Sequence, residues 1–126
     1  MNFSAKVSIM LTTKRSEMGR TKYRPTYSLE MAKRLTAEGS ARMKGRATKF
    51  LIEHYVHADL VAADVFSKIE ERHFRKSVEL EHRPGTWADI YCGMVYDETE
   101  WYVKFFVEDE EPVVEIWSMN WDGAFH

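Results

Sequence analysis

Residues 74 to 119 decide the fold, and they read FRKSVELEHRPGTWADIYCGMVYDETEWYVKFFVEDEEPVVEIWSM. Apolar and polar side chains alternate through much of this stretch, as they do in a β-strand with one buried face. Turn-forming residues interrupt the alternation at 84–85, 97–99 and 109–112. Because short connections join antiparallel neighbours, we expect an antiparallel meander, with strands over 74–81, 87–96, 100–108 and 113–119.

The residues before this stretch follow the helical period of 3.6 instead. Ser28 is a good N-cap and Gly39 a good stop, so the sequence predicts a helix over 29–38. The same apolar spacing predicts two more helices, over 46–55 and 59–71. Helices followed by strands indicate an α+β domain, with N-terminal helices packed on one face of a C-terminal antiparallel sheet.

The length of the chain fits one domain. It has 126 residues and a mass of 14.9 kDa, and single domains commonly have this size. We expect the domain to span residues 24–126. Residues 1–23 are rich in basic and hydroxyl side chains without a sustained period, so we expect a basic, flexible tail there, with 6–12 as its one candidate strand.

Charge is divided unevenly along the chain. Residues 1–50 contain 12 Lys and Arg against 3 Asp and Glu, a balance of +9, whereas residues 51–126 contain 6 against 17, a balance of -11. The net charge of -2 is the sum of these two halves. A basic half is suited to phosphate groups, and an acidic half is suited to a basic partner.

Cysteine content and hydropathy restrict the surroundings of the protein. The single cysteine, Cys92, cannot form an internal disulfide, which fits a reducing cytoplasm. No apolar run approaches the roughly 18 to 20 residues that span a bilayer, so we expect no membrane segment and no secretion signal. His54 and His57 lack further ligands at metal spacing, so we expect no metal and no cofactor, and we interpret this pair as helix-capping or surface side chains.

A cation interrupts the first predicted strand. Lys76 stands within the apolar alternation that includes Phe74 and Val78. A lysine held on a rigid strand can neutralise a phosphate or, with a lowered pKa, transfer a proton. The alternative is an edge-strand lysine that discourages aggregation. His73 and His82 flank this strand, and each is either a general acid or base near neutral pH or a solvated strand-end side chain.

A second polar pair lies on the third predicted strand. Trp101, Val103 and Phe105 share one face of this strand, so Tyr102 and Lys104 share the other. The two side chains either face one phosphate together or belong to an ordinary solvated face of the sheet.

Four motifs in order resemble a known family. They are RPTYSLE at 24–30, Phe74-x-Lys76-Ser77, Trp87-x-Asp89-Ile90-Tyr91 and Tyr102-Val103-Lys104-Phe105. In this order and spacing they resemble the motility quorum-sensing regulator (MqsR) toxins of bacterial type II toxin-antitoxin systems, over about residues 24–120. The resemblance implies a RelE-like fold and an endoribonuclease of messenger RNA, an RNA interferase, that needs neither ribosome nor metal. It also implies a cognate antitoxin partner with a DNA-binding domain.

The resemblance also implies a set of site residues. The functional lysine of the family falls on Lys76 and its functional tyrosine on Tyr102, which are the expected catalytic residues. Candidate supporting residues are Arg75, His73, His82 and Lys104. Two positions depart from the family pattern, because a glutamine of the family falls on Ala88 and a lysine on Asn120. Loss of one charge-assisted contact in an active site costs roughly a hundredfold in rate.

We therefore expect a cytoplasmic toxin that cleaves single-stranded mRNA by attack of a ribose 2′-hydroxyl on its own 3′-phosphate, weakened by the loss at Ala88. Candidate RNA contacts are Arg42, Lys44, Arg46 and Trp87. Trp87 either stacks a base or packs the sheet against its helices. The alternative function is a catalytically inactive module of the same family that binds RNA through the basic half, or a protein partner through the acidic sheet. The sequence leaves enzyme activity open between these two.

Overall fold

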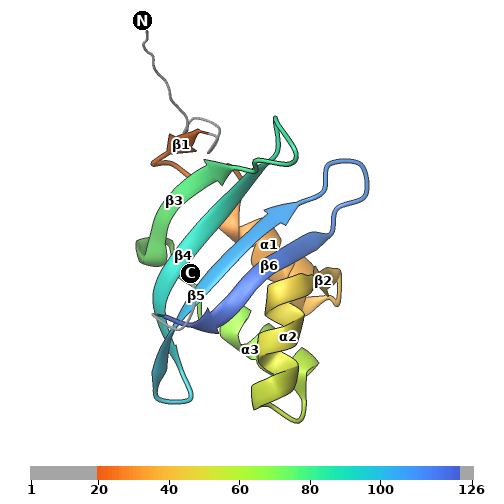
Figure 1. Ribbon diagram of the computed structural model, residues 1–126, viewed down its shortest axis with the longest axis vertical. Coiled ribbons are helices and arrows are strands. Elements are labelled where there is room, and N and C mark those ends of the chain that lie inside the picture. The colour runs from red at the N-terminus through yellow and green to blue at the C-terminus, as the bar shows by residue number, and fades with distance from the viewer. Residues whose placement is uncertain (1–19, 123–126) are drawn as a thin grey trace, which may run out of the picture.

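The computed structural model describes residues 20–122 (Figure 1), so the strand predicted over 6–12 lies outside the described residues. The helices are α1 (Leu29–Ala37), α2 (Gly45–His54) and α3 (Ala58–Ser67). The strands are β1 (Thr21–Lys22), β2 (Ala41–Met43), β3 (Phe74–Glu79), β4 (Trp87–Tyr96), β5 (Thr99–Val107) and β6 (Val114–Trp121). Residues 21–22, which the sequence assigned to the tail, pair with β3.

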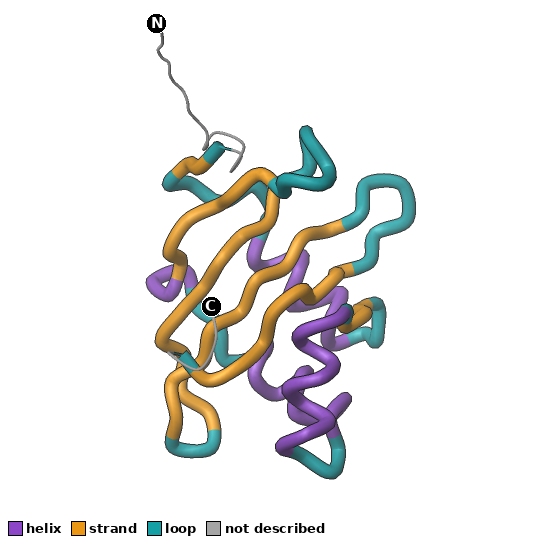
Figure 2. The backbone as a smooth tube through the Cα atoms, in the orientation of Figure 1, coloured by secondary structure: helices purple, strands orange, loops and turns teal. Residues whose placement is uncertain are grey.

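The strands form one mixed sheet in the order β1-β3-β4-β5-β6-β2. The antiparallel meander of β3 to β6 is confirmed, and Figure 2 shows these four strands side by side. A purely antiparallel sheet was wrong, because β2 pairs parallel with β6. β2 has three residues and no alternation of its own, so its pairing depends on a distant strand that local sequence does not reveal. The α+β class is confirmed.

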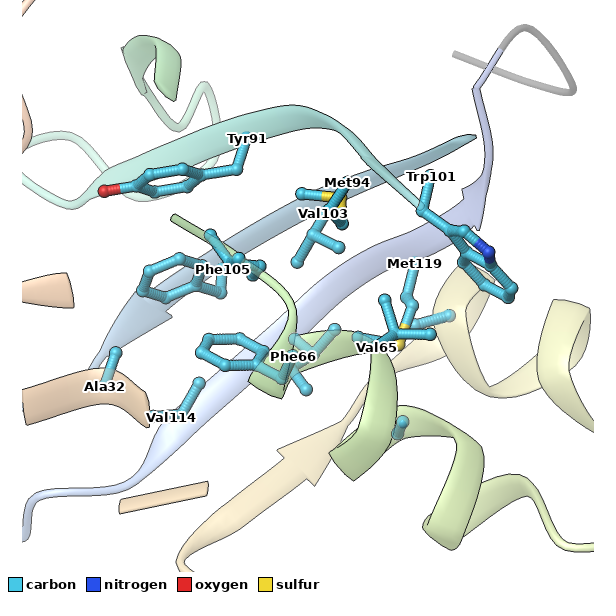
Figure 3. Packing of buried hydrophobic residues seen from close by; sticks show 14 of the residues in the cluster. Ala32, Val65, Phe66, Tyr91, Met94, Trp101, Val103, Phe105, Val114 and Met119 are labelled. Atoms are coloured by element: carbon cyan, nitrogen blue, oxygen red, sulfur yellow. The ribbon is translucent and has the colours of Figure 1, made fainter. Parts of the chain in front are cut away.

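The helices cover one face of this sheet and bury the main core. α1, α2 and α3 contribute Ala32, Leu51 and Phe66 to the same apolar cluster, and each of these side chains is fully buried. Figure 3 shows Val103 and Phe105 of β5 pointing from the sheet toward Phe66 of α3. The Phe66 and Phe105 ring centroids lie 5.1 Å apart. The opposite face of β5 is therefore the face that these helices do not cover.

The ends of the helices follow local chemistry. The Ser28 hydroxyl accepts a hydrogen bond from Met31 N at 3.1 Å and caps α1, and Gly39 with φ +87° follows its end, as the sequence predicted. The helix predicted over 59–71 was too long, because α3 ends at Ser67. Glu70 adopts an extended backbone conformation there and starts a 3-10 turn over Glu71–His73, which leads directly into β3.

A buried carboxylate fastens the segment before α1 to the sheet. Asp89 of β4 is fully buried, and both of its oxygens lie 3.0 Å from Thr26 N. Tyr27 N donates to the same carboxylate at 3.0 Å, and the Thr26 and Ser77 hydroxyls share a hydrogen bond at 2.7 Å. Hydrogen bonds to a charged acceptor are among the stronger contacts in proteins, each worth about 1.5–3 kcal/mol. Several residues of the motifs that carried the resemblance therefore hold the fold together.

Candidate functional site

The candidate residues of β5 lie on the face opposite the helices. Trp101, Val103 and Phe105 enter the main core, so the intervening Tyr102 and Lys104 point to the other side of the sheet. This is the separation that the sequence predicted for the strand. We call this second side of β3 to β6 the open face, because in Figure 1 α1 and α3 lie behind the sheet.

A β-bulge in β3 places Lys76 on the open face. The pairing of β3 with β4 shifts between Phe74 and Lys76, so Phe74 packs in the main core whereas Val78 packs on the open face. The single apolar face predicted for this strand was therefore wrong. Lys76 does not interrupt a core; it shares the open face with Val78.

The strand register brings the two lysines and the tyrosine together. Lys76 of β3 and Lys104 of β5 both stand opposite Ile90 of β4. In the next row, Tyr102 stands opposite Cys92 on one side and Asn120 on the other. Neighbouring strands lie about 4.8 Å apart, so these backbones span roughly 10 Å from β3 to β5, a distance that long side chains bridge.

The electrostatic surroundings of Lys104 favour loss of its proton. Burial lowers the pKa of the Lys104 ammonium, and the charges of Arg46 and Lys76 lower it further, while Glu81 opposes them. Lys104 therefore exchanges a proton more readily than an ordinary lysine does. A bound anion would stabilise the charged form of the same group.

The Tyr102 hydroxyl is protonated at neutral pH. Burial raises the pKa of its phenol, the neighbouring Cys92 raises it further, and Arg46 and Arg75 act in the opposite direction. Because the ordinary pKa of tyrosine is already about 10, the hydroxyl remains protonated. The charge of Arg75 also acts to lower the pKa of the Cys92 thiol. The Arg75 guanidinium therefore contributes to the electrostatic potential at the open face.

The two candidate histidines have different surroundings. His73 is buried, and its Nδ1 accepts a hydrogen bond from Glu70 N at 2.9 Å. Burial lowers the pKa of His73. The charges that act on it are those of Arg72, Glu70 and Lys33, and not those of Lys76 and Lys104. His82 is exposed in the turn between β3 and β4. The structure thus brings neither histidine into the row of Lys76 and Lys104.

Two of the candidate RNA contacts already have partners. Arg42 Nη2 lies 2.7 Å from Glu115 Oε2, in an ion pair. The Trp87 ring is faced by the Lys22 ammonium at 4.4 Å and the Arg20 guanidinium at 5.4 Å. Both side chains lie away from the row of Ile90, so they do not join Lys76 and Tyr102.

Lys44 and Arg46, by contrast, lie beside Lys104. They line a hollow of about 560 Å³ together with Lys104 and Arg83. Sequence reasoning missed Arg83, because it lies in a predicted turn and nothing in the local pattern shows that this turn reaches the hollow. The following residues, Pro84 and Gly85, predicted a turn but not where the Arg83 side chain would lie.

The two departures from the family pattern also lie on the open face. Ala88 is fully buried in a small apolar cluster with Leu80 and Phe106. Asn120 is fully buried opposite Tyr102, and neither atom of its side-chain amide has a hydrogen-bond partner among residues 20–122. A buried amide without partners costs free energy, so Asn120 is a polar group available for a contact that residues 20–122 do not supply.

Two properties of residues 20–122 complete the description. No group of three His, Cys, Asp or Glu side chains in this part of the chain is placed to hold a metal ion. Among the same residues, no helix has the length and apolar character needed to cross a membrane.

Comparison with known proteins identifies the family. A family model described as "Motility quorum-sensing regulator, toxin of MqsA" matches residues 24–118. No curated protein matches the chain. The matched range begins at the segment that Asp89 fastens and includes α1, α2, α3 and the strands from β2 to most of β6. The chain therefore belongs to the motility quorum-sensing regulator family, the toxins of toxin-antitoxin systems whose partner is an antitoxin.

Proposed function

We propose that this toxin is an endoribonuclease of messenger RNA that needs neither ribosome nor metal, and that Lys76, Tyr102 and Lys104 form its active site. The observation that carries the proposal is the register around Ile90, which places both lysines in one row and Tyr102 in the next. The lowered pKa of Lys104 supports it, because proton-transfer groups in active sites commonly have shifted pKa values.

The proposed reaction uses the RNA's own nucleophile. The ribose 2′-oxygen loses its proton and attacks the adjacent 3′-phosphorus, and the bond from phosphorus to the 5′-oxygen of the next nucleotide breaks. The products are a 2′,3′-cyclic phosphate and a 5′-hydroxyl, which takes up one proton. The protein must therefore accept a proton, donate a proton and stabilise negative charge on the phosphorane.

The proposed roles follow from charge and protonation. Lys104 in its neutral form accepts the proton of the 2′-hydroxyl, since its pKa is lowered. Tyr102 donates a proton to the leaving 5′-oxygen, since its raised pKa keeps the hydroxyl protonated. Lys76, with Arg75 beside it in the bulge, stabilises the phosphorane. The exposed His82 lies outside the row and is given no step, whereas the buried His73 supports the turn into β3.

The decisive experiment is cleavage of a defined single-stranded RNA by purified protein in EDTA. We expect a 2′,3′-cyclic phosphate product, and we expect Lys76→Ala to reduce the rate roughly a hundredfold. Lys49→Ala is the matched control, because Lys49 is an exposed cation of α2 whose ammonium lies 3.9 Å from Glu53. Absence of cleavage by the wild type, or equal cleavage by Lys76→Ala, would refute the proposal.

A second candidate function is a catalytically inactive module that binds RNA or a protein partner. The observation that favours it is the apolar cluster around Ala88, which occupies the place of a family glutamine. Growth arrest by the wild type would exclude this alternative. The alternative would be supported if the wild type does not cleave RNA and the Ala88→Gln variant does. Because Ala88 is fully buried, thermal melting must show that this variant is folded.

The proposal extends to the partner and the compartment. We propose that the antitoxin carries a DNA-binding domain and that the pair acts in the cytoplasm, where the single Cys92 stays reduced. The test is the neighbouring gene. A short adjacent reading frame with a Cys-x-x-Cys pair and a helix-turn-helix pattern is the expected finding. An adjacent frame without the helix-turn-helix pattern would contradict this part of the proposal.

A further inference from the structure

The hollow beside Lys104 has the size and charge of an anion site. It measures about 560 Å³ and lies between the start of α2, the turn after β3, and strands β5 and β6. Ligand pockets in proteins commonly measure about 300–1,000 Å³. Three cations from two separate segments, Lys44, Arg46 and Arg83, line it together with the proposed base Lys104. We propose that this hollow is a phosphate subsite, which holds a phosphate of the RNA strand other than the one that is cleaved. That the phosphate belongs to RNA rests on the proposed function.

The cations of the hollow are available to a ligand. The carboxylate in its lining, Glu115, is held by Arg42 at 2.7 Å. Within residues 20–122, no carboxylate forms an ion pair with Arg46, Arg83 or Lys104. Glu81 offsets part of the positive charge around Lys104, but basic side chains outnumber carboxylates in the lining of the hollow and repel one another, and a phosphate relieves that repulsion. The hollow is therefore more stable when an anion occupies it.

The backbone at the start of α2 adds to this field. The N-cap residue of the ten-residue helix is Lys44, which makes no side-chain cap hydrogen bond and carries no acceptor with which to make one. The first N-H groups of a helix and its dipole favour an anion. Gly45 follows with φ +44°, and a Cβ built on it would meet no atom of residues 20–122 within 4 Å, so this part of the chain leaves the space beside the backbone open.

One wall of the hollow is aromatic. The pairing of β5 with β6 shifts between Lys104 and Phe105, so Trp117 has no partner on β5, and Trp117 and Ser118 both line the hollow. The Trp117 ring packs against the Phe106 ring with centroids 5.8 Å apart, which fixes its orientation. Aromatic side chains beside cationic grooves stack on the bases of single-stranded nucleic acids. Trp117 therefore suits the nucleotide whose phosphate the cations hold.

Lys104 joins the subsite to the proposed catalytic row. It stands opposite Ile90 on the side of Lys76 and opposite Ser118 on the side of the hollow. An acidic hollow of about 410 Å³, lined by Glu108, Glu110 and Glu111, adjoins at Arg83 and repels phosphate. An RNA strand that passes Lys76 and Lys104 is thereby directed toward the start of α2.

The test measures binding without cleavage. A fluorescent single-stranded 12-mer of 2′-O-methyl RNA has no nucleophile, so its anisotropy reports binding alone. We expect Arg46→Ala and Arg83→Ala each to weaken binding about tenfold and to reduce the salt dependence of binding by about 0.7 in log-log slope. Lys49→Ala, on the same helix, should stay within about twofold of the wild type. Both arginine side chains are exposed, so these variants keep the fold.

A short substrate separates this inference from the proposed function. A dinucleotide has only the scissile phosphate and does not reach the subsite, so Arg83→Ala should cleave it as fast as the wild type does while the KM for a 12-mer rises. If Arg46→Ala and Arg83→Ala bind the 12-mer no worse than Lys49→Ala, the subsite is refuted even where the wild type cleaves RNA. If the two arginine variants lose binding while no protein cleaves RNA, the subsite stands and the proposed nuclease fails.

Discussion

Lys76 and Lys104 stand on opposite sides of Ile90 in the same row of the sheet. Burial lowers the pKa of Lys104 most, and the charges of Arg46 and then Lys76 lower it further, so the Lys76 and Lys104 ammonium groups repel each other across β4. Such an arrangement costs stability in the free protein and is relieved when an anion binds between them. Relief of this repulsion by a bound phosphate agrees with the proposed function.

The first prediction follows from this repulsion. Lys104→Met keeps the unbranched shape and most of the length of the side chain and removes a partly buried cation, so the free energy of unfolding should rise by about 0.5–1 kcal/mol while RNA cleavage is lost. Urea denaturation at neutral pH measures the gain. Because the pKa of Lys104 is lower in the folded state, the advantage of Met should shrink as pH rises through that pKa.

Lys49→Met is the matched control for this prediction. Lys49 is exposed and paired with Glu53, so its replacement should bring no comparable gain in stability. A Lys104→Met variant that unfolds at the same urea concentration as the wild type, or at a lower one, would show that Lys104 is not strained.

The second prediction tests whether Tyr102 donates the proton to the leaving 5′-oxygen. Tyr102→Phe should slow cleavage of ordinary RNA roughly a hundredfold, because the 5′-oxygen then leaves as an alkoxide. A substrate with sulfur in place of that oxygen needs no proton, so wild type and Tyr102→Phe should cleave it at similar rates. Single-turnover kinetics on both substrates checks this. Equal losses on the two substrates would mean that Tyr102 does not act as the acid.

Local pattern was sufficient for most of the elements and for one strand of the site. The alternation of β5 assigned Tyr102 and Lys104 to one face correctly, because this strand pairs with β4 through a regular row of residues on either side of Ile90. Ser28 and Gly39 marked α1 because capping depends on neighbouring residues alone. Where one residue and its immediate neighbours decide the structure, the sequence was informative.

The rest of the site depends on contacts that local pattern does not encode. The bulge between Phe74 and Lys76 reverses the alternation of β3, and an alternating sequence gives no sign of an extra residue. Arg83 reaches the hollow at α2 only through the path of its turn. The partner of β2 is likewise set by chain topology and not by its three residues.

The third prediction tests the fastening of the segment before α1. Asp89→Asn replaces one carboxylate oxygen with an N-H donor that faces backbone N-H groups, so unfolding free energy should fall by about 2–3 kcal/mol. Asp109→Asn, in the exposed turn before β6, is the control and should change it little. Chemical denaturation compares the two. A cost below about 1 kcal/mol for Asp89→Asn would show that the Thr26 and Tyr27 N-H groups find other acceptors.

The fourth prediction concerns acid stability at the edge of the sheet. Glu79 accepts hydrogen bonds from Arg20 Nε at 3.0 Å and Gly85 N at 2.8 Å, and these partners lower the pKa of its carboxyl from 4.5 to about 2, with the Arg20 side chain as the largest cause. A carboxyl whose pKa is depressed in the folded state contributes stability above its unfolded pKa and loses that contribution as pH falls. The wild type should therefore lose thermal stability between about pH 4.5 and 2. Glu79→Gln should lose less over this interval, because it has no charge to lose. The measurement is the melting temperature across this pH interval, with Glu110→Gln in the exposed acidic turn as the control. If the melting temperatures of the wild type and Glu79→Gln fall in parallel as the pH is lowered, the role of this carboxylate is contradicted.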